Sequence, residues 1–189
     1  METIRTFVAI NLGDDVRTRL RSLVDDLRPA LPTFRWAKPE QLHLTLAFLG
    51  DVDAGRVSEL ATEIRDAVRL MPFEIEWKGL GAFPRASHGS ILWVGADRGS
   101  TEVTALQRSL AETLASAGFP PDSRFTPHVT LARMKRHGGR SADLRTLIDR
   151  HRDESFGVDR VAEVVMMRSD FKSGGSIYTS LAVVPLGGL

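Results

Sequence analysis

The chain has no cysteine, a single tyrosine, and no apolar stretch near the ~20 residues that a helix needs to cross a bilayer. The missing cysteines exclude disulfide bonds, thiolate nucleophiles and cysteine-based metal sites. The opening segment, METIRTFVAINL, lacks the basic start and long apolar run of a signal peptide. We therefore expect a cytoplasmic protein without a membrane segment.

A large excess of charge of either sign is also missing. The formal net charge of +1 excludes a protein that coats nucleic acid through bulk charge, although a local basic site is still allowed. Hydrophobic residues make up 42% and charged residues 26% of the 189 residues. This composition is typical of a globular protein, and the length suits one domain or two small lobes that share a core.

Hydrophobic periodicity predicts alternating strands and helices. Strands are expected over residues 5–12, 43–49 (ending at Gly50), 73–80, 90–96, 125–134, 160–169 and 176–186. Helices are expected from residue 14 to Pro29 and over residues 55–70, 101–117 and 141–153. Each half of the chain offers a helix, a strand that carries a histidine, and a later pair of strands. This order favours an α+β protein with two similar lobes.

One pattern, His-x-Thr-Leu, occurs twice, in QLHLTLAFLG (41–50) and in TPHVTLARM (126–134). Strand side chains alternate in direction, so His43 and Thr45 share one face, as do His128 and Thr130. A single copy is usually no more than the polar face of a strand. Chance gives only about 0.06 matches in a chain of this composition, so two copies indicate one shared site.

Two imidazoles and two hydroxyls suit few reactions. Zinc needs a third ligand, and neither copy has a histidine or carboxylate at i+2 or i+4. A serine hydrolase uses one base, not a doubled histidine. Hydrolysis of a cyclic phosphodiester fits, because one neutral imidazole takes a proton from water while a protonated one donates to the departing ribose oxygen. The hydroxyls can hold the phosphate oxygens, and no metal or cofactor is required.

The paired motifs resemble those of the 2H phosphoesterases, and within them the RNA 2',3'-cyclic phosphodiesterases, formerly named 2'-5' RNA ligases. The resemblance extends to RTFVAINL (5–12), RWAKPEQLHLTLAFLG (35–50), GAFPRASHGSILWVG (81–95) and FTPHVTLAR (125–133). It implies one bilobal domain over residues 1–189, with pseudo-two-fold symmetry and an active cleft between antiparallel sheets backed by helices. It also implies that a 2',3'-cyclic phosphate is opened to a 2'-phosphate, with His43 as proton donor and His128 as proton acceptor. The nearly symmetric sequence does not itself assign these two roles.

Two further residues lie after the motifs at the same spacing. Arg133, five residues after His128, could grip a phosphate through two parallel hydrogen bonds, or be a solvated arginine at a strand end. Phe48, five residues after His43, could stack on the terminal base or pack in the core. Tyr178 could reach the cleft but is assigned no role.

Two other functions stay open at this point. The same chemistry run backwards would make a 2'-5' RNA ligase, although water at ~55 M favours hydrolysis. A module that binds phosphorylated RNA ends without turnover is the second alternative, but both histidines and both threonines are intact. The expected partners are RNA with a 2',3'-cyclic phosphate end or small cyclic nucleotides. We expect no membrane partner, and a monomer.

Overall fold

The computed structural model describes residues 2–86, 89–120, 124–135, 144–173 and 175–187. The helices are α1 (Asp14–Leu27), α2 (Val57–Ala67), α3 (Ser100–Ser116) and α4 (Leu144–Arg150), with two 3₁₀ turns, η1 (Pro39–Gln41) and η2 (Ala54–Arg56). The strands are β1 (Thr3–Asn11), β2 (Phe34–Trp36), β3 (His43–Asp53), β4 (Phe73–Phe83), β5 (Ile91–Ala96), β6 (His128–Met134), β7 (Ser155–Val161), β8 (Glu163–Lys172) and β9 (Gly175–Pro185). None of these helices is both long and apolar enough to span a membrane.

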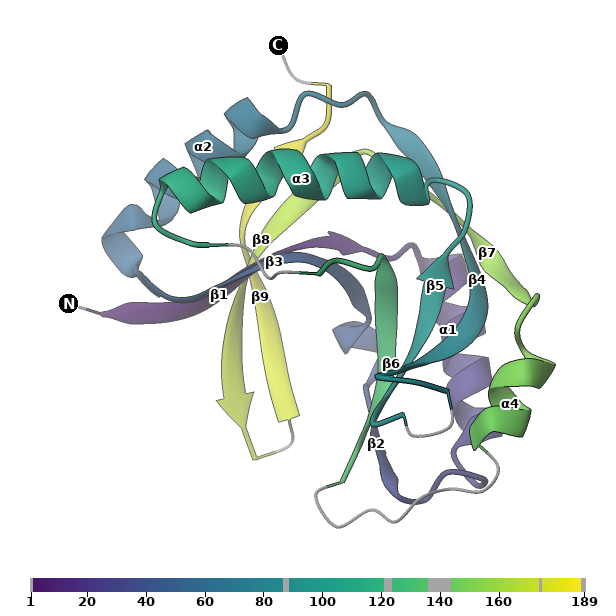
Figure 1. Cartoon of the computed structure of the whole chain (residues 1–189). Coiled ribbons are helices and arrows are strands. Elements are labelled where there is room, and N and C mark those ends of the chain that lie inside the picture. Colours follow the sequence, from purple (N-terminus) through teal and green to yellow (C-terminus); the bar gives the residue numbers. More distant parts are fainter. Residues whose placement is uncertain (1, 87–88, 121–123, 136–143, 174, 188–189) are drawn as a thin grey trace.

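All the strands join in one curled antiparallel sheet of order β7-β4-β5-β6-β3-β1-β8-β9, with β2 added alongside β6. The sheet is nearly divided in two, because β3 and β6 share a single paired position, Leu44 with Val129, among the described residues. We call β3-β1-β8-β9 the first half-sheet and β6-β5-β4-β7, with β2, the second half-sheet. The predicted α+β class with two antiparallel lobes is confirmed (Figure 1).

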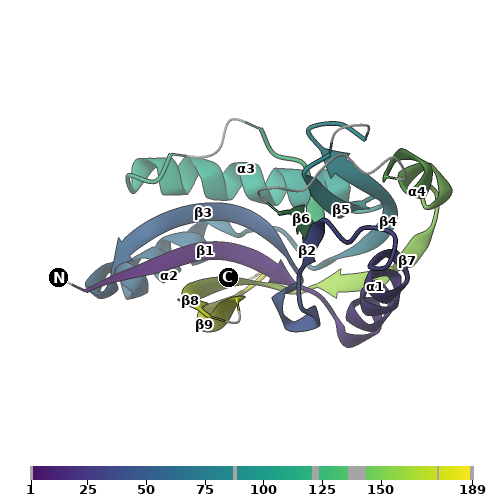
Figure 2. The same ribbon diagram turned by 90° about the horizontal axis from the view of Figure 1, so that it is seen from below.

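The lobes are not the two halves of the sequence, as the order of predicted elements suggested. Strands β8 and β9, from the end of the chain, complete the sheet that β1 and β3 begin. Helices also cross over. Helix α1 follows β1 but packs on β7, whereas α3 follows β5 but packs on β3 and α2 (Figure 2). Each half-sheet is therefore covered by a helix that directly follows a strand of the other half-sheet.

Most predicted elements are present, with different ends. Strand β3 continues past Gly50 to Asp53, because Gly50 adopts a φ of 70° and still pairs with Thr6 on β1. Strands β2 and β7 were not predicted. Helix α4 covers residues 144–150, while the predicted helix start at 141–143 lies outside the described residues.

A buried carboxylate fastens α1 to the second half-sheet. Asp159 on β7 accepts hydrogen bonds from the backbone N–H of Gly13, at 3.1 Å, and from Trp77 Nε1, at 2.8 Å. Burial raises the pKa of this carboxyl group, and the two hydrogen bonds oppose that shift. A Cβ on Gly13 would lie 2.6 Å from the carboxylate oxygen, so only glycine allows this close approach.

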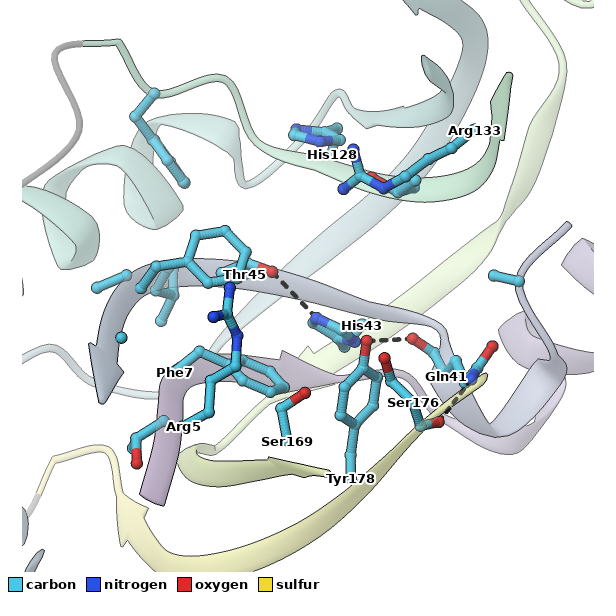
Figure 3. Close-up of a pocket in the computed structure, with 18 of the residues that line it drawn as sticks. Arg5, Phe7, Gln41, His43, Thr45, His128, Arg133, Ser169, Ser176 and Tyr178 are labelled. Atoms are coloured by element: carbon cyan, nitrogen blue, oxygen red, sulfur yellow. Dashed lines mark hydrogen bonds between the residues drawn. The ribbon is translucent and has the colours of Figure 1, made fainter. Parts of the chain in front are cut away.

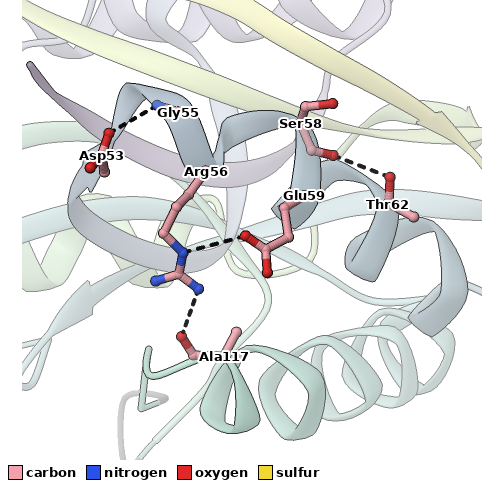
Figure 4. Close-up of polar contacts among 7 residues, drawn as sticks. All are labelled: Asp53, Gly55, Arg56, Ser58, Glu59, Thr62 and Ala117. Atoms are coloured by element: carbon pink, nitrogen blue, oxygen red, sulfur yellow. Dashed lines mark hydrogen bonds and ion pairs between the residues drawn. The ribbon is translucent and has the colours of Figure 1, made fainter.

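A second contact joins the end of β3 to the end of α3 (Figure 4). The Asp53 carboxylate accepts a hydrogen bond from Gly55 N–H at 2.9 Å and shapes the turn into α2. From this turn the Arg56 guanidinium donates to the carbonyl of Ala117 at 3.2 Å and lies 5.4 Å from the centre of the Phe119 ring. The first motif strand is thus tied to the segment that leads into the second.

Candidate active site

The two His-x-Thr strands meet at one cavity of about 900 Å³, which His43, Thr45, His128 and Thr130 all line. The strand alternation that was predicted from sequence holds, since Leu44, Leu46, Val129 and Leu131 are buried in the core. Figure 3 shows His128 and Arg133 across the cavity from His43 and Thr45. The structure therefore brings together the two motifs that are 85 residues apart.

Both histidine rings are held by the same kind of backbone bond. Nδ1 of His43 donates to the carbonyl of Gln41 at 2.8 Å, and Nδ1 of His128 donates to the carbonyl of Thr126 at 2.7 Å. A carbonyl oxygen can only accept, so each Nδ1 carries a hydrogen and each Nε2 is left for chemistry. Nε2 of His43 lies 3.0 Å from the hydroxyl of Thr45.

Aromatic rings pack around each imidazole. The His43 ring lies 4.9 Å from that of Phe7 and meets the edge of Tyr178 at 5.1 Å, centre to centre. The His128 ring meets the edge of Phe83 at 5.1 Å and lies 6.0 Å from Trp93. Sequence reasoning did not identify these rings as site residues, and it assigned Tyr178 no role. Their position around the histidines depends on strand pairing, which the sequence does not display.

Burial lowers the pKa of both histidines below the usual 6.5. The Nδ1 hydrogen bonds oppose this shift, while the positive charge of Arg133 lowers the pKa of each ring further, and His128 lowers that of His43. The direction of these shifts favours the neutral form of both imidazoles near pH 7. An anion bound between them would favour protonation and raise the pKa of either ring.

A β-bulge follows each motif at the same place. The β1–β3 pairing passes from Ala9–Thr45 to Val8–Ala47 and omits Leu46. The β5–β6 pairing passes from Trp93–Thr130 to Leu92–Ala132 and omits Leu131. Each bulge adds one residue to its strand and so reverses the alternation beyond it.

The bulges decide where the residues five positions after each histidine lie. In a regular strand, such residues would face opposite sides. Because of the extra residue, Arg133 and Phe48 instead line the cavity with the histidines. Phe48 is 58% exposed, so the alternative in which it packs in the core is wrong. Arg133 is also exposed, on the cavity side of β6.

The cavity has a positive lining. The basic side chains that line it are Arg5, Arg35, Arg124, Arg133 and Lys135, and no described Asp or Glu lies among the lining residues. Such a lining attracts anions and disfavours cations. The charge thus agrees with the local basic site that the balanced total charge left open.

Gln41 connects the first motif to the end of the first half-sheet. Its side-chain Nε2 donates to the carbonyl of Ser176 on β9 at 2.6 Å, and its Oε1 accepts from the N–H of Lys38 at 2.9 Å. Its own carbonyl is the acceptor that orients His43. Sequence reasoning missed Gln41 because this role belongs to its backbone and depends on a contact with a strand 135 residues away.

Comparison with known proteins gives a consistent set of similarities. Residues 6–170 match the model of the 2'-5' RNA ligase superfamily. The chain is 35% identical to the RNA 2',3'-cyclic phosphodiesterase of Methanothermobacter thermautotrophicus, over 97% of this chain and 99% of that one. It is 31% identical to the protein of the same name from Aquifex aeolicus, over the full length of both. The structure of E. coli LigT complexed with 3'-AMP superposes with a TM-score of 0.80 and 25% identity, over 99% of this chain and 100% of that one.

Proposed function

The chain belongs to the 2'-5' RNA ligase superfamily, and from this premise we propose that it is an RNA 2',3'-cyclic phosphodiesterase that leaves a 2'-phosphate. The observation that carries the proposal is the matched presentation of two histidines. Each ring donates from Nδ1 to a carbonyl two residues earlier, and each lines the same positively charged cavity. A displacement at phosphorus needs one group to take a proton and another to give one, and this pair supplies both.

In the proposed reaction, Nε2 of neutral His128 takes a proton from water as the water oxygen bonds to phosphorus. The bond from phosphorus to O3' breaks, and O3' takes the proton from Nε2 of His43. The products are a 2'-phosphate and a free 3'-hydroxyl, with one proton moved from His43 to His128 overall. Exchange with solvent restores both rings, and no step is assigned to a metal.

Three side chains are proposed to hold the phosphate. The hydroxyls of Thr45 and Thr130 share a strand face with the two histidines and can donate to the non-bridging oxygens as charge develops. Arg133 can offer two parallel N–H groups to the same oxygens. Phe48, exposed on the cavity wall, is proposed to stack on the terminal base.

Substrate binding itself would set the protonation that the reaction needs. Burial lowers the pKa of each ring and so favours the neutral form of both. A bound phosphate anion would counter this effect and raise the pKa of both rings, and the proposed mechanism places the proton on His43. His128, the proposed base, must remain neutral.

The test is incubation with a 2',3'-cyclic mononucleotide in EDTA, followed by chromatography that separates 2'- and 3'-phosphates. We expect the 2'-phosphate from the wild type and rates lower by 10²–10⁴-fold from His43→Ala and from His128→Ala. His151→Ala is the matched control, because His151 bonds Glu154 and does not line the cavity. Binding without turnover would support a binding module, and joining to an added 5'-hydroxyl end would support the ligase.

A further inference from the structure

Two exposed phenylalanines mark the cavity wall. The large exposed hydrophobic residues of the described chain are Phe48, Met71, Val158, Phe171, Ile177 and Val183. Of these, only Phe48 and Phe171 line the cavity, and both are aromatic. Phe171 is 72% exposed, so core packing does not explain it. Aromatic side chains left open on the wall of an anion-binding cavity are suited to stacking with bases.

Phe171 is paired with a cation that has no carboxylate partner among the described residues. The Arg5 guanidinium lies 5.4 Å from the centre of the Phe171 ring, and Arg5 also lines the cavity. Asp51 lies opposite Arg5 in the β1–β3 register, yet no ion pair joins these two described residues. Arg168, on the same strand as Phe171, is by contrast bonded to Asp170 at 2.9 Å. The charge of Arg5 is thus available to a ligand.

The Arg5–Phe171 stack lies beside the catalytic groups but not among them. Arg5 precedes Phe7 by two residues on β1, so both side chains face the cavity about 7 Å apart along the strand. Phe7 packs against His43 and lies opposite Phe48 in the register. Figure 3 shows Arg5, Phe7 and Ser169 along the wall that leads away from His43. His43 lies opposite Asn11, near the end of β1, and Phe48 lies opposite Phe7. Arg5 is two residues further from His43 along β1.

We propose that Arg5 and Phe171 form a second nucleotide subsite, which binds the nucleotide that precedes the cyclic end. Arg5 binds the phosphodiester between the last two nucleotides, and the Arg5–Phe171 stack supports the base of the preceding one. The inference rests on the proposed function and deepens it, because the preferred substrate becomes an RNA end of two or more nucleotides. A cavity of about 900 Å³ with five basic side chains has room and charge for more than one phosphate.

The test compares kcat/KM for a dinucleotide with a 2',3'-cyclic end and for the matching cyclic mononucleotide. We expect the wild type to prefer the dinucleotide by roughly 5- to 150-fold, the range for one base stacked on an aromatic ring. Phe171→Ala and Arg5→Gln should both lower this preference toward one. The preference should also weaken at higher salt in the wild type, and less so in Arg5→Gln.

Ile177→Ala is the matched control, since Ile177 is 52% exposed on the same hairpin but does not line the cavity. Equal kcat/KM for the two substrates in the wild type would overturn the subsite, as would an unchanged preference in both variants. If the wild type hydrolyses neither substrate, the proposed function fails, and calorimetry still decides the subsite. Tighter binding of a dinucleotide 2'-phosphate than of the mononucleotide, lost in Phe171→Ala, would support it, and equal binding would overturn it.

Discussion

In each imidazole, a hydrogen bond to a backbone carbonyl decides which ring nitrogen is available for proton transfer. With Nδ1 donating to a carbonyl in both motifs, the two rings present Nε2 as equivalent groups. The surroundings of the two rings, however, differ. Thr45 lies against Nε2 of His43, and the charges that lower the pKa of His43 include that of His128. The charge of His128 thus acts on His43 in addition to the burial that lowers the pKa of both rings.

The pH dependence of the reaction should reflect this environment. The acid must be protonated and the base neutral, so kcat/KM should follow a bell. Because burial lowers both pKa values in the free enzyme, both limbs shift to lower pH, and the maximum should lie below pH 6.5. Bound phosphate raises these pKa values, so the bell for kcat should lie at higher pH than that for kcat/KM. Rates measured in EDTA across pH 4–9 test this, and a flat profile would contradict the acid–base pair.

The division of roles between the histidines can be tested with an activated substrate. An aryl phosphodiester has a good leaving group, which departs without a proton, so the general acid becomes dispensable. We expect His43→Ala to recover much of its lost rate on such a substrate, and His128→Ala to recover little. Recovery in His128→Ala alone would exchange the two roles. Recovery in neither would argue against proton donation to the leaving oxygen.

At the scale of elements, the sequence predicted the features that depend on local alternation. His43 with Thr45, and His128 with Thr130, were correctly placed on one strand face, and the helices were found from their periodicity. The bulges at Leu46 and Leu131 were not predictable, because a bulge is defined by the partner strand. They decide that Arg133 and Phe48 reach the cavity.

The unpredicted strands have related causes. Strand β2 has three residues, too few for a pattern, and the Gly157 φ of 110° interrupts the alternation in β7. The addition of β8 and β9 to β1 joins segments more than 150 residues apart. Such a pairing depends on how the whole sheet assembles, and no local pattern encodes it.

Replacing Arg133 tests whether the side chain that the bulge at Leu131 directs into the cavity has a function. Arg133→Ala should raise KM about 10- to 150-fold, the loss for hydrogen bonds to a charged group. Arg133→Lys should recover part of this, because it keeps the charge but not the planar pair of donors. Since Arg133 lowers the pKa of both histidines, Arg133→Ala should also move the kcat/KM bell to higher pH.

The control for this series is Arg160→Ala, which removes an exposed arginine of β7 that does not line the cavity. A shift of the kcat/KM bell in Arg133→Ala would show that Arg133 acts on the histidines in the cavity. A higher KM with an unmoved bell would show only a loss of affinity. An unchanged KM with an unmoved bell would mean that Arg133 is only a solvated arginine at a strand end.

At the scale of the whole molecule, the two half-sheets share one buried hydrophobic core but almost no strand pairing. Their strands share one paired position, Leu44 with Val129, among the described residues. The crossing helices α1 and α3, and the contact of Arg56 with Ala117, supply further connections. Because the cavity takes one histidine from each half-sheet, its geometry depends on these connections. We therefore expect the chain to unfold as one domain, although its sheet is nearly divided.

The fluorescence of the three tryptophans allows the expected one-step unfolding to be measured. Trp36, Trp77 and Trp93 all lie on strands of the second half-sheet, so their fluorescence reports on that half-sheet alone. Leu60, fully buried in α2, belongs to the side of the first half-sheet. Leu60→Ala should lower the free energy of unfolding by about 2–5 kcal/mol. If the domain is one cooperative unit, this distant change must shift the tryptophan transition as much as the transition seen by circular dichroism.

Urea unfolding followed by both signals distinguishes the two cases, with Arg65→Ala, an exposed change on the same helix, as control. Coincident midpoints that fall together in Leu60→Ala mean that neither half-sheet is stable without the other. A tryptophan midpoint that stays at its wild-type value while the circular dichroism splits into two steps would mean that the half-sheets fold separately. In that case the single pair between β3 and β6 would be a hinge, and the distance between His43 and His128 would be free to change on substrate binding.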